Sequence, residues 1–473
     1  MYDGNDAEHR PTDATGTGPE VTYEQWCSQV PQLTHSFEDR LDMDPVAVAA
    51  QLARADLGRQ YIVYEREGVW HFAAGPSVEA SVTADTLRLR VGEWEQTIPI
   101  DDPIGAIEAA VCQLRQTERV RCYGWVAFEL AYLLHGGRSV ADSDPLIHVM
   151  VPAVDVELGD GRICVHATTA TLLDRTVAVL QETATAPETV PIPLLDDTPD
   201  RYTQIVDEVV ERINGRQLDK AVLSRMVPLP DHPRIDLPAT YVAGRRANTP
   251  ARSFMLRLGS WSAVGFSPET VVEVAADGRV RTQPLAGTRA LHPDPETNQR
   301  VRADLLSDPK EIHEHAISVR LALEEVRAVS SEGTVSVTEF MEIEERGSVQ
   351  HLASRVVGTL RAAESPWTAL ASLFPAVTVT GAPKANALRL IDELEEDERG
   401  LYGGAVLMLE PDGGLDAALT LRTVFHRNGR SWLRAGAGIM GQSTPDREWE
   451  ETREKLSSIA PHLRGTIHDE DTR

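Results

Sequence analysis

The chain has 473 residues, of which 42% are hydrophobic and 25% are charged, and its formal net charge at pH 7 is −27. These proportions are ordinary for a globular enzyme, and a chain of this length can bury a large core without disulfides. Length alone would suggest roughly three domains. Because so acidic a chain repels phosphate backbones and anionic lipids, we expect neither a nucleic-acid partner nor a membrane partner.

The cysteines and the N-terminus indicate the compartment. No CxxC pair is formed by the four cysteines, which favours reduced thiols; they are Cys27, Cys112, Cys122 and Cys164. The first 20 residues, MYDGNDAEHRPTDATGTGPE, lack the basic start and apolar core of a signal peptide, so they predict a disordered tail. There is also no run of about 18 apolar residues to span a membrane. We therefore expect a cytoplasmic protein.

The first half of the chain, residues 21–181, mixes alternating and helical stretches. TLRLRVGEWEQTIPI (86–100) alternates apolar and polar residues around a glycine, which predicts a hairpin. YGWVAFELAY (123–132) is apolar and aromatic and is expected in the core. Residues 182–200 contain four prolines and few packing residues, which predicts a linker.

Hairpins dominate the second half, residues 201–465. It opens with a predicted helix that stops at Gly215, and a long helix is predicted from Pro309 to Val329. Two more helices are predicted at 383–396 and 444–460. The predicted strands are KAVLSRMVPL, SFMLRL, TVVEVAA, GRVRTQPLAG, GSVQHLASRVVGTL, GLYGGAVLMLE, LDAALTLRTVFH and SWLRAGAGI. This pattern favours an α+β fold with antiparallel sheets.

Two pairs of glutamates share one spacing. Glu311 and Glu314 lie three residues apart in the long predicted helix, and Glu448 and Glu451 repeat this near the C-terminus. Residues three apart lie on the same helix face, and each pair is expected at the edge of an apolar stripe. Four carboxylates that converge from two helices suit a hard cation such as Mg²⁺ or Ca²⁺.

Other interpretations of the glutamates stay open at this point. A zinc HExxH motif would need histidine at position 317, where the chain has Ile317. A di-iron bundle would need two ExxH motifs, which neither helix has. Such glutamate pairs are also common on solvated helix faces, where they bind nothing.

Further candidates lie on the predicted strands and turns. Lys220 heads an apolar strand and could act as a general base, although a lysine at a strand end more often reaches water. Glu269 follows a proline in a tight turn, where it is either a positioned acid or a turn residue. Gly287 permits close approach of a ligand and Thr288 can donate to a carboxylate. A glycine-rich turn at 436–438 before a helix N-terminus suits an anion.

These motifs occur in the order found in chorismate-utilising enzymes. The chain resembles this family over residues 200–465 and more faintly at 123–132. The family includes anthranilate, aminodeoxychorismate, isochorismate and salicylate synthases. The motifs are KAVLSR, GFSPE, PLAGTRA, DPKEIHEHA, RGSVQHL, TGAPK, GLYGGAV, LTLR, RAGAGI and REWEETREKL. The resemblance implies one large α+β domain over 21–465, two antiparallel sheets packed as a sandwich with helices outside, and a tail at 466–473.

The resemblance also implies roles for single residues. Lys220 would be the base that activates water for attack at C2 of chorismate, and Glu269 the acid that protonates the departing C4 hydroxyl. A bound Mg²⁺ would bridge to the ring carboxylate of chorismate, held by Glu311, Glu314, Glu448 and Glu451. The substrate would also be contacted by Gly287, Thr288, Gly438 and Lys455 near that carboxylate, by Tyr402 and Arg422 at the enolpyruvyl carboxylate, and by His351 and Thr378 in the pocket wall.

Three features favour water over ammonia as the nucleophile. Family members that add ammonia resemble glutamine at the position of Lys220. Aminodeoxychorismate synthases look like PIKGT, whereas this chain has PLAGT with Ala286 in place of the attacking lysine. None of the cysteines sits in a GxCxG elbow, which argues against a glutaminase within the chain and leaves a separate subunit open. With water as the nucleophile, no glutaminase partner is expected.

Within the family, the stretches PLAGTRA, ERGSVQHLAS and PDREWEETREKLSSIAPHL look most like salicylate synthases of siderophore pathways. These enzymes form isochorismate and then eliminate pyruvate in the same site. An isochorismate synthase and, third, an anthranilate-type synthase are the alternatives. The segment TGAPK resembles the ammonia users, because salicylate synthases tend to carry GIPK where this chain has Ala382. A binding protein on a degenerate family fold is the non-enzyme alternative.

Overall fold

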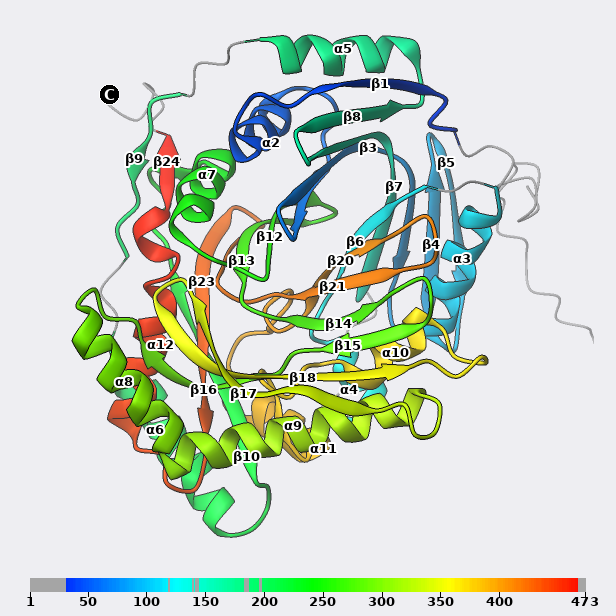
Figure 1. Cartoon of the computed structure of the whole chain (residues 1–473). Helices are drawn as coiled ribbons and strands as arrows, with labels where there is room; N and C mark the ends of the chain where they lie inside the picture. The colour runs from blue at the N-terminus through cyan, green and yellow to red at the C-terminus, as the bar shows by residue number, and fades with distance from the viewer. Residues whose placement is uncertain are drawn as a thin grey trace, which may run out of the picture.

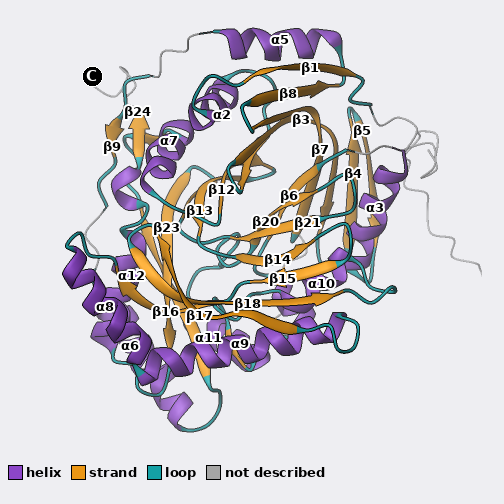
Figure 2. Cartoon of the chain, in the orientation of Figure 1, coloured by secondary structure: helices purple, strands orange, loops and turns teal. Residues whose placement is uncertain are grey.

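A computed structural model describes residues 31–117, 120–137, 140, 144–182, 187–194 and 198–466 (Figure 1). The tail predicted at 1–20, residue Cys27 and residues 467–473 lie outside the described residues. Most strands belong to one antiparallel sheet that closes on itself, and helices lie around its outside (Figure 2).

The strands of the closed sheet come from both halves of the chain. Those of the first half are β1 (His35–Arg40), β2 (Tyr61–Arg66), β3 (Val69–Val82), β4 (Thr86–Val91), β5 (Trp94–Pro99), β6 (Cys122–Val126), β7 (Ile147–Gly159) and β8 (Arg162–Ala167). Those of the second half are β10 (Lys220–Pro228), β12 (Arg252–Leu258), β13 (Trp261–Ser267), β14 (Thr270–Val274), β15 (Arg279–Thr282), β16 (Leu285–Ala290), β17 (Ser336–Arg346), β18 (Val349–Thr359), β19 (Gly381–Ala382), β20 (Ala405–Leu409), β21 (Leu415–Leu419), β22 (Thr423–Arg427) and β23 (Arg430–Ile439).

Strand pairing joins the two halves directly. β2 pairs antiparallel with β12, and β6 pairs antiparallel with β20. A separate three-stranded sheet contains β11 (Arg234–Ile235), β24 (Arg464–Thr466) and β9 (Val190–Pro191). β9 falls within the proline-rich stretch 182–200, so the described part of that stretch is anchored to the C-terminal end of the domain.

Helices cover the outside of the closed sheet, as Figure 2 shows. Those of the first half are α2 (Pro45–Arg54), α3 (Pro103–Thr117), α4 (Leu130–His135) and α5 (Ala170–Gln181). Those of the second half are α6 (Asp200–Asn214), α7 (Leu237–Ala247), α8 (Pro295–Ser307), α9 (Pro309–Val329), α10 (Pro366–Leu373), α11 (Lys384–Leu394), α12 (Pro445–Leu456) and the 3₁₀ turn η1 (Ala460–His462).

The helices that matter for function start at sequence signals. Asp308 caps α9, because its side chain accepts hydrogen bonds from the backbone N–H groups of Lys310 and Glu311, and Pro309 fills the first helical position. Thr444 and Pro445 start α12 in the same order. These signals place Glu311 and Glu448 near the N-terminal ends of their helices, where a carboxylate is stabilised by the helix dipole.

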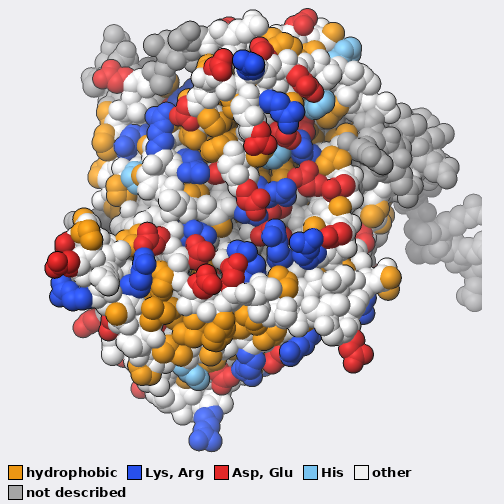
Figure 3. Space-filling model, viewed as in Figure 1, with side chains coloured by type: hydrophobic (Ala, Val, Ile, Leu, Met, Phe, Trp, Pro, Cys, Tyr) orange, Lys and Arg blue, Asp and Glu red, His pale blue; other side chains and the backbone are white. Residues whose placement is uncertain are grey.

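The α+β class, the single large domain and its antiparallel strands are confirmed. The predicted hairpin at 86–100 corresponds to β4 and β5, and the predicted long helix has the bounds of α9. The strand predicted from GLYGGAV begins only at Ala405, because the preceding residues form turns. On the face viewed in Figure 3, acidic and basic side chains are interspersed. In the described part of the chain, every helix is too short or too polar to cross a membrane.

Candidate active site

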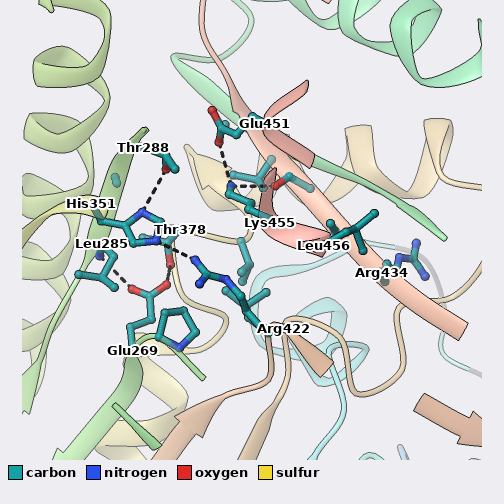
Figure 4. Close-up of a pocket in the computed structure, with 18 of the residues that line it drawn as sticks. Glu269, Leu285, Thr288, His351, Thr378, Arg422, Arg434, Glu451, Lys455 and Leu456 are labelled. Atoms are coloured by element: carbon teal, nitrogen blue, oxygen red, sulfur yellow. Dashed lines mark hydrogen bonds and ion pairs between the residues drawn. The ribbon is translucent and has the colours of Figure 1, made fainter. Parts of the chain in front are cut away.

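A cavity of about 50 Å³ is lined by residues of β10, β16, β18 and β23, and Figure 4 draws residues of its wall. It has room for a few water molecules at about 10–15 Å³ each. The predicted site residues in its wall are Glu269, Gly287, Thr288, Glu314, His351, Thr378, Tyr402, Arg422, Gly438, Glu451 and Lys455. Lys220 and Glu311 lie directly behind this wall, against Glu314 and Thr288, and Glu448 pairs with Lys310 next to them. The sequence motifs therefore converge on one site.

Lys220 is the first residue of β10 and its side chain is buried. Its Nζ lies 2.9 Å from Oε1 of Glu314 and donates a hydrogen bond to Oγ of Ser318 at 3.2 Å. Pairing of Lys220 with Ala382 of β19 fixes the strand end at this point. The interpretation of Lys220 as a lysine that reaches water is therefore wrong, since α9 holds it inside the protein.

Glu269 lies in the turn between β13 and β14 and is 3% exposed. Its Oε2 accepts from the backbone N–H of Leu285 at 2.9 Å and its Oε1 accepts from Oγ1 of Thr378 at 2.7 Å. Burial raises the pKa of Glu269 to about 7, against the lowering effect of these hydrogen bonds and of nearby lysines. A carboxyl group with such a pKa can carry a proton near neutral pH, as a general acid must.

Three polar side chains form a chain of hydrogen bonds along the cavity wall (Figure 4). Nη2 of Arg422 lies 2.7 Å from Nε2 of His351, and Nδ1 of His351 lies 3.1 Å from Oγ1 of Thr288. A guanidinium only donates, so Nε2 accepts and the imidazole proton is on Nδ1, which donates to Thr288. The hydroxyl proton of Thr288 is then available to a ligand. Burial, with the positive charge of Arg422, holds the pKa of His351 well below its usual range.

All four glutamates of the two predicted pairs are buried, at 7% exposure or less. They lie within the buried faces of α9 and α12 and not at the edges, so the expected edge position was wrong. Each carboxylate is paired with a cation of the chain. The nitrogen-to-oxygen distances in these ion pairs are 3.0 Å for Arg289–Glu311, 2.9 Å for Lys220–Glu314, 2.9 Å for Lys310–Glu448 and 2.9 Å for Lys455–Glu451.

Burial and repulsion between carboxylates raise the pKa of these glutamates, whereas their cationic partners lower it. Burial and then the charge of Glu451 raise the pKa of Glu448. Burial would also raise the pKa of Glu451, but Lys455 and Lys310 hold it below its ordinary value. The two carboxyl groups therefore behave as one strongly interacting pair.

Lys310 is not among the site residues predicted from the sequence, yet it lies among the four carboxylates. Its Nζ is 2.9 Å from Oε1 of Glu448 and 3.5 Å from Oε1 of Glu311. Burial lowers the pKa of Lys310, but all four glutamates raise it, and the net direction is upward. The cluster thus already surrounds one positive charge. The signal that could have identified Lys310 is its place beside Glu311, in the first turn of the same helix.

The four carboxylates fit a divalent cation chemically, although they do not form a ready-made ligand set. Within the described ranges, no three His, Cys, Asp or Glu side chains gather as a metal site. Oε2 of Glu448, however, is buried and has no hydrogen-bond partner among the described residues. A buried carboxylate oxygen without a donor calls for a cation or a water molecule. Glutamate oxygens are ligands that Mg²⁺ accepts.

Glycines shape the wall between the cavity and the carboxylates. Gly438 lies so close to Glu314 that a Cβ atom would stand 2.1 Å from Oε1 of that carboxylate. Gly287 has a φ of +85°, which side chains rarely adopt, and a Cβ there would lie 3.3 Å from Cβ of Glu311. Lys455 donates to the carbonyl oxygen of Gly436 at 2.9 Å. Backbone in both strands therefore passes directly against the acidic cluster.

The two histidines beside the first glutamate pair have different environments. His313 is exposed. His315 is buried between the carbonyl oxygen of Ala286 at 3.1 Å and Oγ of Ser354 at 2.6 Å. Burial lowers the pKa of His315 to about 4, so it is a neutral structural residue.

Two relatives match the chain, the first of them over most of its length. A salicylate synthase from Mycolicibacterium paratuberculosis (strain ATCC BAA-968 / K-10) is 41% identical over 426 residues, which are 89% of this chain and 94% of that protein. An anthranilate synthase component 1 from Halobacterium salinarum is 39% identical over 292 residues, which are 60% of this chain and 55% of that protein. Similarity is therefore more extensive to the first protein.

Solved structures share the fold. The anthranilate synthase component I from Streptococcus pneumoniae TIGR4 superposes with a TM-score of 0.69 at 24% identity and covers 95% of this chain and 100% of its own. The menaquinone-specific isochorismate synthase from Escherichia coli has a TM-score of 0.68 at 20% identity, over 90% of this chain and 94% of its own. At such identities the likeness concerns the fold alone.

One family model spans nearly the whole described domain. It is the model of the chorismate binding enzymes, and it matches residues 59–461. This range contains every residue named above in the cavity wall and in the acidic cluster. The chain thus belongs to the chorismate-binding enzyme family.

Proposed function

We propose that the protein is a salicylate synthase. It would convert chorismate to isochorismate by water addition at C2 and then to salicylate and pyruvate by elimination, with Mg²⁺ as cofactor. The observation that carries the proposal is one pair of buried groups of opposite charge type, Glu269 in the cavity wall and Lys220 directly behind it, 2.9 Å from Glu314 of the same wall. The 41% identity to a salicylate synthase supports the same choice.

The first step needs one base and one acid. Lys220, acting in its neutral form, would take a proton from water while the water oxygen bonds to C2, the ring double bond shifts, and the C4 hydroxyl leaves. Glu269, whose raised pKa keeps a proton near neutral pH, would give that proton to the leaving oxygen. One water enters and one leaves, so chorismate and isochorismate are isomers. Burial of both groups prevents the proton from being lost to solvent.

Mg²⁺ would be held by Glu311, Glu314, Glu448 and Glu451, and would neutralise the ring carboxylate. The protein's own residues would hold the rest of the substrate. Thr288 has a hydroxyl proton free for a carboxylate, and Arg422 and Tyr402 also line the cavity. Because these three residues are buried, their hydrogen bonds to a substrate would be stronger than the same bonds in water.

The second step needs no further acid or base. Hydrogen moves from C2 to the enolpyruvyl methylene carbon while the C3–O bond breaks, which releases pyruvate and leaves the aromatic ring of salicylate. The site has only to hold the side chain over the ring and to exclude water. His351, Tyr402 and Arg422 of the cavity wall are buried, which helps to exclude water from a bound substrate.

A product assay tests the proposal. Purified protein is incubated with chorismate and MgCl₂, without ammonia, and the products are separated by chromatography. Salicylate and pyruvate in equal amounts are the expected result. Isochorismate without pyruvate would make the protein an isochorismate synthase, and the packing of Ala382 against Ile317 and Met440 would be the first wall to examine. Anthranilate formed only with added ammonium would overturn water as the nucleophile and the expected absence of a glutaminase partner.

A further inference from the structure

Lys310 differs from the other cations near the four glutamates because it contacts glutamates of both helices. Lys220, Arg289 and Lys455 each lie close to one glutamate of a single helix. Lys310 lies within 3.5 Å of Glu311 on its own helix, α9, and within 2.9 Å of Glu448 on α12. It is thus the cation, among the described residues, that bridges the two helices that carry the carboxylates.

Burial makes this bridge energetically important. The side chain of Lys310 is 14% exposed, while those of Glu311 and Glu448 are 2% and 0% exposed. Like charges at this depth repel strongly, and an uncompensated buried carboxylate is destabilising. Without a cation between them, α9 and α12 would repel each other at their N-terminal ends.

A divalent cation bound by the four glutamates would compete with Lys310. Oε1 of Glu448 accepts from Lys310, whereas Oε2 of Glu448 is buried without a partner. An ammonium 2.9 Å from a ligand oxygen would repel a divalent ion placed on the same carboxylate. Lysine has a flexible four-carbon stem and a compact charge, so the ammonium of Lys310 can move away from the carboxylates toward solvent.

We propose that Lys310 is an internal counter-cation that holds the acidic cluster together in the metal-free protein and is displaced when a divalent cation binds. The inference rests on the magnesium site of the proposed function. It adds that the metal site exists in two forms, one in which the Lys310 ammonium offsets the carboxylate charge and one in which the metal does. Lys310 is therefore a positioning residue that sets the affinity for the metal.

Metal affinity without substrate is the direct test. Binding of MgCl₂ is measured by titration calorimetry for the wild-type protein, Lys310→Met, Lys310→Arg and Lys384→Met. Methionine keeps the shape of lysine without its charge, and arginine keeps the charge. Lys384 is the matched control, because it is a buried lysine that pairs with Glu325 at 2.7 Å outside the cluster. Thermal unfolding of each protein is recorded in EDTA and in MgCl₂.

We expect Lys310→Met to bind Mg²⁺ about tenfold or more tightly than the wild type, since a competing cation is gone. In EDTA its midpoint of unfolding should fall by at least about 2 °C, and MgCl₂ should remove the deficit. Lys310→Arg and Lys384→Met should keep the wild-type affinity. If Lys384→Met has a lower midpoint of unfolding than the wild type in EDTA, that difference should persist in MgCl₂.

Equal or weaker Mg²⁺ binding by Lys310→Met would overturn the inference. So would a loss of stability that MgCl₂ leaves unchanged, because Lys310 would then be an ordinary structural ion pair. The proposed function fails by a different result, namely a wild-type protein that does not convert chorismate in the product assay. The two outcomes are therefore distinguishable.

Discussion

Nζ of Lys220 lies 2.9 Å from Oε1 of Glu314, so the proposed water-activating base directly contacts a proposed metal ligand. The two residues come from β10 and α9, and neither position is exposed to solvent. Groups in direct contact usually have non-additive effects when both are changed. The base and the metal site are thus one unit, and each should respond to changes in the other.

Lys220→Ala should reduce turnover of chorismate by roughly 10³-fold or more, because the base for water is removed. Rates are measured with saturating MgCl₂ and far-ultraviolet circular dichroism checks the fold. Since the substitution leaves Glu314 without its partner, some loss of stability is expected as well. Retained turnover in a folded variant would remove Lys220 from the mechanism.

The pH dependence of turnover should report Glu269. The acid must be protonated, and its pKa is raised to about 7 by burial. Activity that depends on the acid is therefore present below pH 7 and falls as pH rises above it. The limb is measured as kcat/KM against pH. In Glu269→Gln the overall rate should drop and this limb should vanish; a limb that survives in the variant would belong to another group.

The same residue predicts a gain in stability. A carboxyl group whose pKa rises from 4.5 to about 7 on folding makes the folded state less stable as pH increases through that window, by about 3 kcal/mol at pH 8. Glutamine removes this cost and still fits, because its oxygen can accept from Leu285 and its amide can donate to Thr378. Glu269→Gln should therefore unfold at higher urea concentration than the wild type at pH 8, but not at pH 4.5. Equal stability at pH 8 would contradict the raised pKa.

Local signals in the sequence predicted the individual helices and strands better than the tertiary contacts between them. The bounds of α9 follow from Asp308 and Pro309, and the spacing of Glu311 and Glu314 follows from the helix itself. The bridge from Lys310 to Glu448 depends on how α9 and α12 pack, which no local pattern contains.

Two strands were not predicted from the sequence, because one lies in a strongly charged stretch and the other in a proline-rich stretch. β17 reads SVTEFMEIEER, and its glutamates obscured an alternation that pairs with β18. Val190 and Pro191 form β9 within a stretch whose prolines predict a linker. In both places the partner strand, and not the segment's own composition, decides the structure.

Arg422→Lys should weaken substrate binding more than it slows chemistry. The guanidinium donates to the carbonyl oxygen of Arg346 and to His351, each at 2.7 Å, and burial lowers the pKa of Arg422 to about 10. Lysine cannot reproduce the planar fork, so His351 would lose its orientation. We expect KM for chorismate to rise about tenfold or more, with a smaller change in kcat. Arg430→Lys, at an exposed position on β23, is the control. An unchanged KM would exclude Arg422 from substrate binding.

Glu448→Gln should weaken the binding of Mg²⁺ on which activity depends. The substitution removes one of four carboxylates and replaces its unpartnered oxygen by a neutral group, so the concentration of Mg²⁺ needed for half-maximal activity should rise about tenfold or more. Glu450→Gln is the matched control, because Glu450 lies on the same helix with its side chain 49% exposed and pairs with Arg453. Direct titration with MgCl₂ separates binding from catalysis. If both variants titrate like the wild type, Glu448 is not a metal ligand, and its burial beside Lys310 has a structural purpose only.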